Sequence, residues 1–147
     1  MERIGVVRNA VKEPVDEGWG RVESEIVLDE ALADGLDGID SFSHVLILFW
    51  MDRAAEAEPV RMRRRPQGRS DMPEVGIFAQ RARHRPNPVG VTAVELLRRE
   101  RNRLVVRGLD AIDGTPVLDV KPYVPRFDAV EAPRLPPWIH RLMEGYF

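Results

Sequence analysis

Polar and apolar residues alternate over short stretches along much of the chain. Between residues 22 and 28 the alternate positions hold Val, Ser, Ile and Leu, mostly with charged residues between them, which is typical of a half-buried strand. Val45–Met51 is instead a continuous apolar run, and such a run predicts a strand buried on both faces. Similar short segments predict further strands at 4–7, 75–79, 89–97, 104–111 and 116–123.

Short strands with little helix between them indicate an all-β protein, a single antiparallel β-barrel or sandwich domain with short helical turns. One helical turn is expected at Gly35–Phe42. Asp113-Gly114 lies between two apolar segments and predicts a hairpin, because tight hairpin turns need the positive φ that these residues tolerate. A Rossmann fold is excluded, since no Gly-x-Gly-x-x-Gly follows a strand and opens a helix.

The length of 147 residues suits one domain. Arg53–Met72 is polar and rich in arginine and proline, so it is expected to form a long surface loop, and such loops are usually functional or disordered. The chain after Val124 is rich in proline and ends in Trp138–Met143, where we expect at most a short amphipathic helix packed on the barrel or on a partner chain.

Composition narrows the functional classes. The sequence has no cysteine, which excludes disulfides and thiolate chemistry, and its three histidines are not paired at metal-ligand spacing, so no metal is expected. The longest apolar run is about a third of a membrane span, so no membrane partner is expected. The N-terminal residues lack the pattern of a secretory signal, and we therefore expect a cytoplasmic protein.

Charge is distributed unevenly although the net charge is only −2. Residues 61–85 hold eight arginines against Asp71 and Glu74, whereas most acidic residues lie elsewhere. Such a segment forms either a phosphate-binding surface or simply a solvated loop. The arginines are at positions 61, 63, 64, 65, 69, 81, 83 and 85.

Two motifs are unusual for a plain barrel. In the segment from Arg81 to Gly90, prolines flank Asn87 and stiffen the turn, which would hold the Asn87 side chain in one orientation while Gly90 permits close approach of a ligand. An ordinary proline turn is the alternative. Farther along, Asp119, Lys121 and Tyr123 alternate and so share one face of a strand, either as a site or as a cross-strand surface ion pair.

Together these segments resemble the TsaA-like family, also called TrmO, the tRNA N6-threonylcarbamoyladenosine methyltransferases. The resemblance rests on Arg-x-x-x-Arg-Pro-Asn-Pro-x-Gly at 81–90 and Asp-Gly-Thr-Pro-Val-x-Asp-x-Lys-Pro-Tyr-x-Pro at 113–125, in order and at the expected spacing. It covers the chain from Ile4 to about Asp128, so residues 1–128 are expected to form the methyltransferase domain and 129–147 a tail. Many bacterial members continue into a further small domain, whereas this sequence ends at Phe147.

The resemblance implies a homodimeric barrel enzyme that binds S-adenosylmethionine near the subunit interface and methylates N6 of the modified adenosine at position 37, beside the anticodon. The N-terminal cofactor segment departs from the Pro-Arg-Gln signature of the family. The implied cofactor contacts are Asp16, Glu17, Gly18, Asp52, Arg53, Arg81, Val91, Ala93, Ala111, Ile112, Asp113 and Gly114.

Residue chemistry suggests the remaining roles. Methyl transfer to nitrogen needs alignment and a proton acceptor, so Asp119, Lys121 and Tyr123 are the catalytic candidates, although a substrate carboxylate is an alternative acceptor. Arg85 and Asn87 are candidate substrate contacts, and tRNA phosphates are expected at Arg63, Arg64 and Arg65. Two alternatives stay open: a methyltransferase for a small molecule or another acceptor, and a cofactor-binding module without catalysis.

Overall fold

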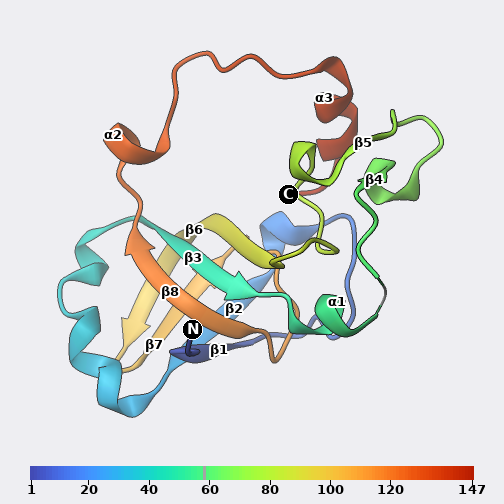
Figure 1. Cartoon of the computed structure of the whole chain (residues 1–147). Helices are drawn as coiled ribbons and strands as arrows, with labels where there is room; N and C mark the ends of the chain where they lie inside the picture. The colour runs from blue at the N-terminus through green and yellow to red at the C-terminus, as the bar shows by residue number, and fades with distance from the viewer. Residues whose placement is uncertain (58) are drawn as a thin grey trace.

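The computed structural model describes residues 1–57 and 59–147, and its centre is a closed antiparallel barrel (Figure 1). Its strands follow one another around the barrel in the order β1-β2-β7-β6-β3-β8. The expected all-β barrel is therefore confirmed, and every strand pair recorded among the described residues is antiparallel. The barrel strands are β1 (Gly5–Arg8), β2 (Glu23–Leu28), β3 (His44–Trp50), β6 (Val89–Glu100), β7 (Arg103–Arg107) and β8 (Pro116–Pro122).

The core fills the barrel because alternate residues of each strand point inward. On β3 the buried positions are Val45, Ile47 and Phe49, all at most 2% exposed. Their ladder partners on β6 include Val94 and Thr92, which are also buried. The outward residues of β3 are only half-buried, so the predicted burial of this strand on both faces is wrong for the single chain.

A small lobe and three short helices flank the barrel. The lobe pairs β4 (Arg63–Arg64) with β5 (Val75–Gly76), and its interior is formed by Pro66, Met72 and Ile77. The helices are α1 (Asp52–Ala57), α2 (Pro125–Asp128) and α3 (Pro137–Met143), and 3₁₀ helices cover Trp19–Arg21, Glu30–Leu36, Ile39–Ser41, Pro66–Gly68 and Ile77–Ala79. The expected C-terminal helix is confirmed by α3, and the helical turn expected before β3 by two 3₁₀ segments.

Two further sequence-based expectations about strands are wrong. The segment 75–79 lies outside the barrel, because only Val75–Gly76 pairs, with β4, and Ile77 then buries its side chain in a 3₁₀ turn. Asp113-Gly114 does form a tight turn, in which Gly114 has φ 85°, but it joins no hairpin. The strands on either side, β7 and β8, are not neighbours, since each pairs with other strands.

The arginine-rich segment is more ordered than a plain loop. Arg65 donates to the carbonyl of Met72, and the buried amide of Gln80 donates to the carbonyls of Arg64 (2.8 Å) and Val75 (3.2 Å). These bonds close the lobe on itself. Glu58, within the expected surface loop, lies outside the described residues.

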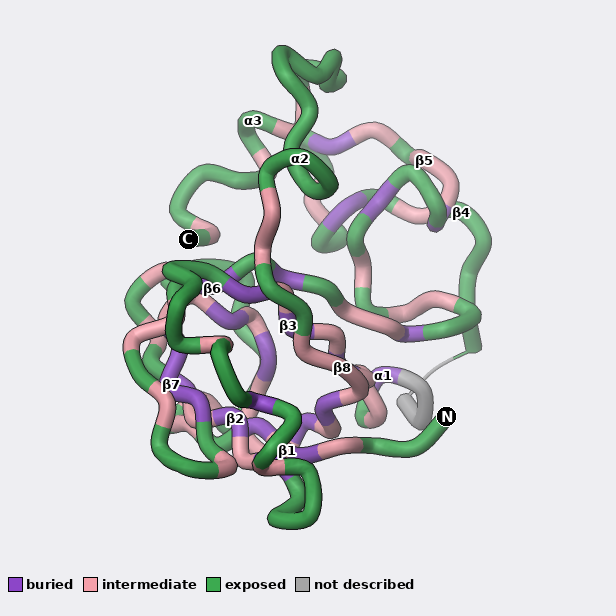
Figure 2. The backbone as a smooth tube through the Cα atoms, turned by 90° about the vertical axis from the view of Figure 1, so that its left-hand side faces the viewer, coloured by how far each residue is buried: buried purple, intermediate pink, exposed green. Residues whose placement is uncertain are grey.

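The C-terminal segment first leaves the barrel and then returns to it. Residues 125–137 are all exposed, and they arch away from the barrel between α2 and α3 (Figure 2). The last residues pack beside the N-terminal loop, where the amides of Gly18 and Trp19 donate to the carbonyls of Gly145 and Tyr146, both at 2.8 Å.

Candidate functional site

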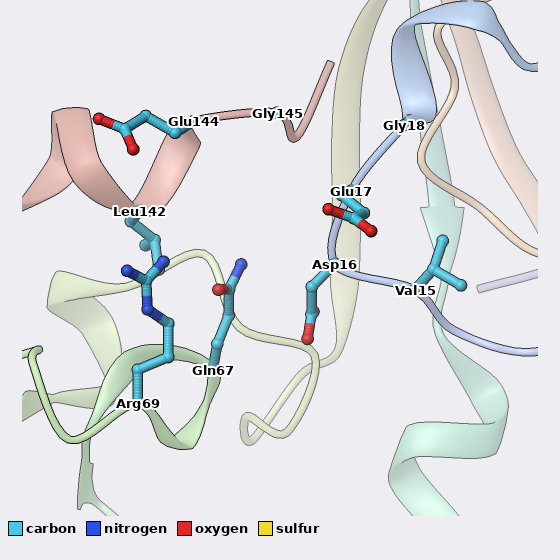
Figure 3. A pocket seen from close by; sticks show the side chains of 9 residues that line it. All are labelled: Val15, Asp16, Glu17, Gly18, Gln67, Arg69, Leu142, Glu144 and Gly145. Carbon is cyan, nitrogen blue, oxygen red and sulfur yellow. The ribbon is translucent and has the colours of Figure 1, made fainter.

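The predicted N-terminal cofactor contacts line a cavity between three segments of the chain. Asp16, Glu17 and Gly18 form one side, and the lobe contributes Gln67 and Arg69 across the opening (Figure 3). The cavity measures about 800 Å³, which lies within the range of small-molecule sites. The third side is the C-terminal segment, through Leu142, Glu144 and Gly145.

A partly buried polar cluster joins this loop to two other predicted cofactor segments. The Tyr146 hydroxyl donates to Asp110 (2.7 Å), and the Thr92 hydroxyl donates to the other oxygen of the same carboxylate. Thr92 lies between the predicted contacts Val91 and Ala93, and Asp110 directly precedes Ala111. Three segments far apart in sequence thus meet at one end of the barrel.

Charged groups surround the Tyr146 hydroxyl. Burial raises the pKa of this phenol well above its ordinary value, and the charge of Asp110 raises it further. Asp16 adds to the increase, whereas the positive charge of Arg81 opposes it, so both predicted cofactor contacts lie near the hydroxyl. Arg81 is also fixed by donating to the carbonyl of Val91.

The remaining predicted cofactor contacts form a second, adjoining cluster. Lys12 pairs with Asp113 at 2.8 Å, and Arg53 donates to the Lys12 carbonyl at 3.1 Å. The hydrogen bond from Lys12 lowers the pKa of Asp113, with a smaller contribution from the amide of Asn9. Asn9 connects the clusters, since its side chain donates to the carbonyl of Ala111 at 2.8 Å. Asp52, Ile112 and Gly114 flank these residues in the chain.

Two of the predicted catalytic residues, Asp119 and Lys121, lie on the outer face of β8, and Tyr123 directly follows the strand. Asp119 and Lys121 form an ion pair of 2.6 Å along the strand, half exposed to solvent. The ring of Tyr123 lies edge-on to His44, with ring centroids 6.4 Å apart. In the register of the sheet, Asp119 is opposite Leu48, which is opposite Val91, so the acid and a predicted cofactor contact share a face two strands apart.

The proline motif is held mainly by backbone contacts. Pro88 is buried, its carbonyl accepts from Met51 at 2.8 Å, and Asn87 is exposed. Arg85 donates to the carbonyl of Gln80 at 3.1 Å. The missing side chain of Gly90 leaves room for the ring of Phe49, so core packing also accounts for this glycine, and the ligand role expected of it stays a prediction.

The predicted phosphate contacts are partly engaged within the lobe. Arg63 pairs with Glu74 at 3.4 Å, and Arg65 holds the Met72 carbonyl. Arg69, on the cavity wall, forms a two-point pair with Asp71. Arg61 is exposed and Arg64 half-buried, so the lobe still presents positive charge to solvent.

Sequence reasoning missed several residues of this region. Asn9, Lys12, Thr92, Asp110 and Tyr146 carry the hydrogen bonds that assemble it. One signal was available for Thr92: this polar residue occupies an inward position of β6, two residues before the apolar inward residue Val94. The contact of Tyr146 with Asp110 spans 36 residues and left no local signal.

The described residues contain no helix long and apolar enough to cross a membrane. Within that part of the chain, His, Asp and Glu side chains also do not gather in a group of three able to hold a metal ion.

Comparisons with known proteins agree with the motifs. A family model described as the tRNA-methyltransferase O N-terminal domain matches residues 9–129. An S-adenosyl-L-methionine-binding protein of Archaeoglobus fulgidus is 41% identical over 134 residues, covering 88% of this chain and 93% of that protein. A tRNA (adenine(37)-N6)-methyltransferase of Escherichia coli is 36% identical over 136 residues, covering 85% of this chain.

Solved structures share the fold. A crystal structure of TrmO from Pseudomonas aeruginosa aligns with a TM-score of 0.74 and 32% sequence identity, over 92% of this chain and 59% of that one. The chain likewise spans 57% of the Escherichia coli relative, so it matches little more than half of these longer proteins. The motifs, the barrel and the family model agree, and the chain belongs to the tRNA-methyltransferase O family.

Proposed function

We propose that this protein transfers a methyl group from S-adenosylmethionine to N6 of N6-threonylcarbamoyladenosine at position 37 of tRNA. The observation that carries the proposal is the meeting of segments 16–18, 91–93 and 110–111 around one polar cluster beside a cavity of about 800 Å³. Family membership and the names of the archaeal and bacterial relatives support the same reaction.

The residues of the cavity fit the cofactor chemically. S-adenosylmethionine carries a positive sulfonium, an ammonium, a carboxylate and ribose hydroxyls. Asp16 and Glu17 offer acceptors for the hydroxyl and cationic groups. Arg81 does not line the cavity but acts on the nearby Tyr146 hydroxyl, and it suits the carboxylate, since guanidinium and carboxylate groups pair in two-point geometry. Residues 52–53 and 111–114 complete the proposed cofactor set, with Val91 and Ala93.

The cofactor supplies an electrophilic methyl group, and the chain's own residues align the acceptor and handle its proton. Asp119 accepts the proton released by the exocyclic nitrogen, and Lys121, 2.6 Å away, orients that carboxylate. Tyr123 stacks on or orients the adenine, while Arg85 and Asn87 hold the threonyl group. Exposed arginines of the lobe bind tRNA phosphates.

We further propose that the functional form is a homodimer. Leu46 and Leu48 on the outer face of β3 are only half-buried, and Phe127 on α2, which is 86% exposed, lines a pocket together with Leu46. The arch of residues 125–137 also carries Val130, 76% exposed. A second copy covering this face would bury these residues beside Asp119. In this proposal residues 1–128 are the methyltransferase domain, 129–147 is the dimer arm and tail, and the protein acts on tRNA in the cytoplasm.

The test is methylation of tRNA in vitro. The purified chain is incubated with S-adenosylmethionine, a chelator and tRNA that carries N6-threonylcarbamoyladenosine, and the nucleosides are analysed by mass spectrometry. We expect the N6-methyl form with the chelator present. The matched control is tRNA lacking the threonylcarbamoyl group, which should gain no methyl group at this position.

Two outcomes would contradict the proposal. Cofactor binding by calorimetry without any methylation of modified tRNA would favour a small-molecule acceptor or a non-catalytic module. Methylation abolished by the chelator would contradict a metal-free reaction.

A further inference from the structure

The last three residues of the chain contact more than one of the proposed cofactor segments. The carbonyls of Gly145 and Tyr146 accept from the amides of Gly18 and Trp19, both at 2.8 Å. The Tyr146 hydroxyl then reaches Asp110 at 2.7 Å, and that carboxylate also accepts from Thr92. One short segment thus links the N-terminal loop to the turn after β7, and through Asp110 it is connected to β6.

The N-terminal loop is also shaped to fit the C-terminal residues, through Gly20. A Cβ atom at Gly20 would lie 2.5 Å from the carbonyl carbon of Phe147 and 3.2 Å from its Cα. These are backbone atoms, so they cannot turn aside as a side chain would. Gly20 has no positive φ, and the three atoms nearest to such a Cβ all belong to Phe147. The loop therefore accommodates the tail only because residue 20 is glycine.

We propose that the C-terminal segment Gly145–Phe147 is a positioning element of the cofactor site, and that Tyr146 is its key residue. The proposal rests on the methyltransferase function proposed above. The segment holds loop 16–18 against Asp110 and Thr92 before the cofactor arrives. Binding is tighter when a site is ordered in advance, because less conformational entropy is then lost.

Burial and charge agree with this role. Tyr146 is half-buried, and its raised pKa, caused first by burial and then by Asp110, is consistent with a phenol that donates to this carboxylate. Leu142, Glu144 and Gly145 also line the cavity (Figure 3). The C-terminal residues therefore form one wall of the site in addition to holding the N-terminal loop in place.

The experiment compares four variants of the full chain by calorimetry with S-adenosylmethionine. Tyr146→Phe removes the hydroxyl, Gly20→Ala obstructs docking from the loop, and a deletion of residues 145–147 removes the tail. Each should weaken cofactor binding by about tenfold or more, which is the scale of a lost hydrogen bond to a charged group. Met143→Ala is the matched control, because this last residue of α3 lies just before the segment, is 40% exposed, and should leave cofactor binding at the wild-type level.

Steady-state kinetics distinguish positioning from a general loss of structure. Positioning raises KM for the cofactor and leaves KM for tRNA unchanged, whereas a smaller folded fraction lowers the apparent kcat alone. The tail deletion supplies a further check, because Gly20→Ala should have no additional effect in the shortened chain.

Three results would overturn the proposal. Wild-type affinity in Tyr146→Phe and Gly20→Ala would make the contact purely structural, and tighter binding by the shortened chain would make the tail an obstruction. Absence of cofactor binding by the wild-type chain would instead overturn the methyltransferase function, and this proposal with it.

Discussion

Gly90 tests whether a motif glycine serves packing or a ligand. A Cβ atom at this position would lie 2.9 Å from Cδ2 of Phe49 and closer still to Cε2 and Cζ. The ring is 2% exposed inside the barrel, so it cannot move into solvent. Gly90 does not have a positive φ, and alanine therefore introduces no backbone strain here.

We expect Gly90→Ala to destabilise the protein by about 1–3 kcal/mol, the usual cost of overpacking a filled core. For a chain of this size the loss corresponds to a decrease in Tm of roughly 2–4 °C per kcal/mol. Urea denaturation measures it, and the matched control is Gly35→Ala. A Cβ there meets nothing within 4 Å, and its φ is not positive, so this variant should be at least as stable as the wild type.

A double-mutant cycle with Phe49→Leu identifies the cause. If the ring is the obstacle, Gly90→Ala costs less in the Phe49→Leu background, with a coupling of about 1 kcal/mol or more. Equal costs in both backgrounds would refute the packing argument. A Gly90→Ala variant of normal stability that no longer binds S-adenosylmethionine would instead support the ligand role.

Three further predictions follow from the site. The pKa of Asp113 is lower in the folded than in the unfolded protein, so its carboxylate stabilises the fold above the unfolded pKa of about 3.9, and this stabilisation is lost as the pH falls through the folded pKa. Asp113→Asn should therefore flatten the acid side of a Tm–pH profile. Parallel profiles of variant and wild type would contradict the Lys12 contact. Sedimentation should give twice the 16.8 kDa chain mass, and Phe127→Asp should shift it toward monomer; a wild-type monomer that methylates would exclude a shared site. When glutamine replaces three arginines of the lobe, the log–log slope of tRNA affinity against salt should fall by about 0.7–0.9 per lost phosphate contact, with unchanged cofactor affinity. The control replaces Arg101 and Arg103, at the β6–β7 turn, with glutamine and should leave the slope unaltered. A constant slope in the triple variant would make the lobe a solvated surface. The three are Arg61, Arg63 and Arg64, since Arg65 holds the lobe together.

The sequence by itself determined the class of fold and the family. Alternation of apolar and polar residues reports which strand face is buried, and this signal is local, so the strands of the barrel could be read without any partner. The motif at 113–125 specified a family because its residue types and spacing occur together. The motif could not specify which strands pair. Asp113-Gly114 has the residue types of a hairpin turn, yet the strands before and after it, β7 and β8, are not neighbours in the barrel.

Tertiary structure decided which residues act together. Asp110 and Tyr146 are both polar residues in ordinary sequence contexts, and only chain reversal through the arch brings the hydroxyl to the carboxylate. Gly90 likewise has the same local signature whether it faces a ligand or Phe49, and the strand register selects the ring. Contacts between distant residues depend on closure of the barrel and return of the tail, and no local pattern encodes either.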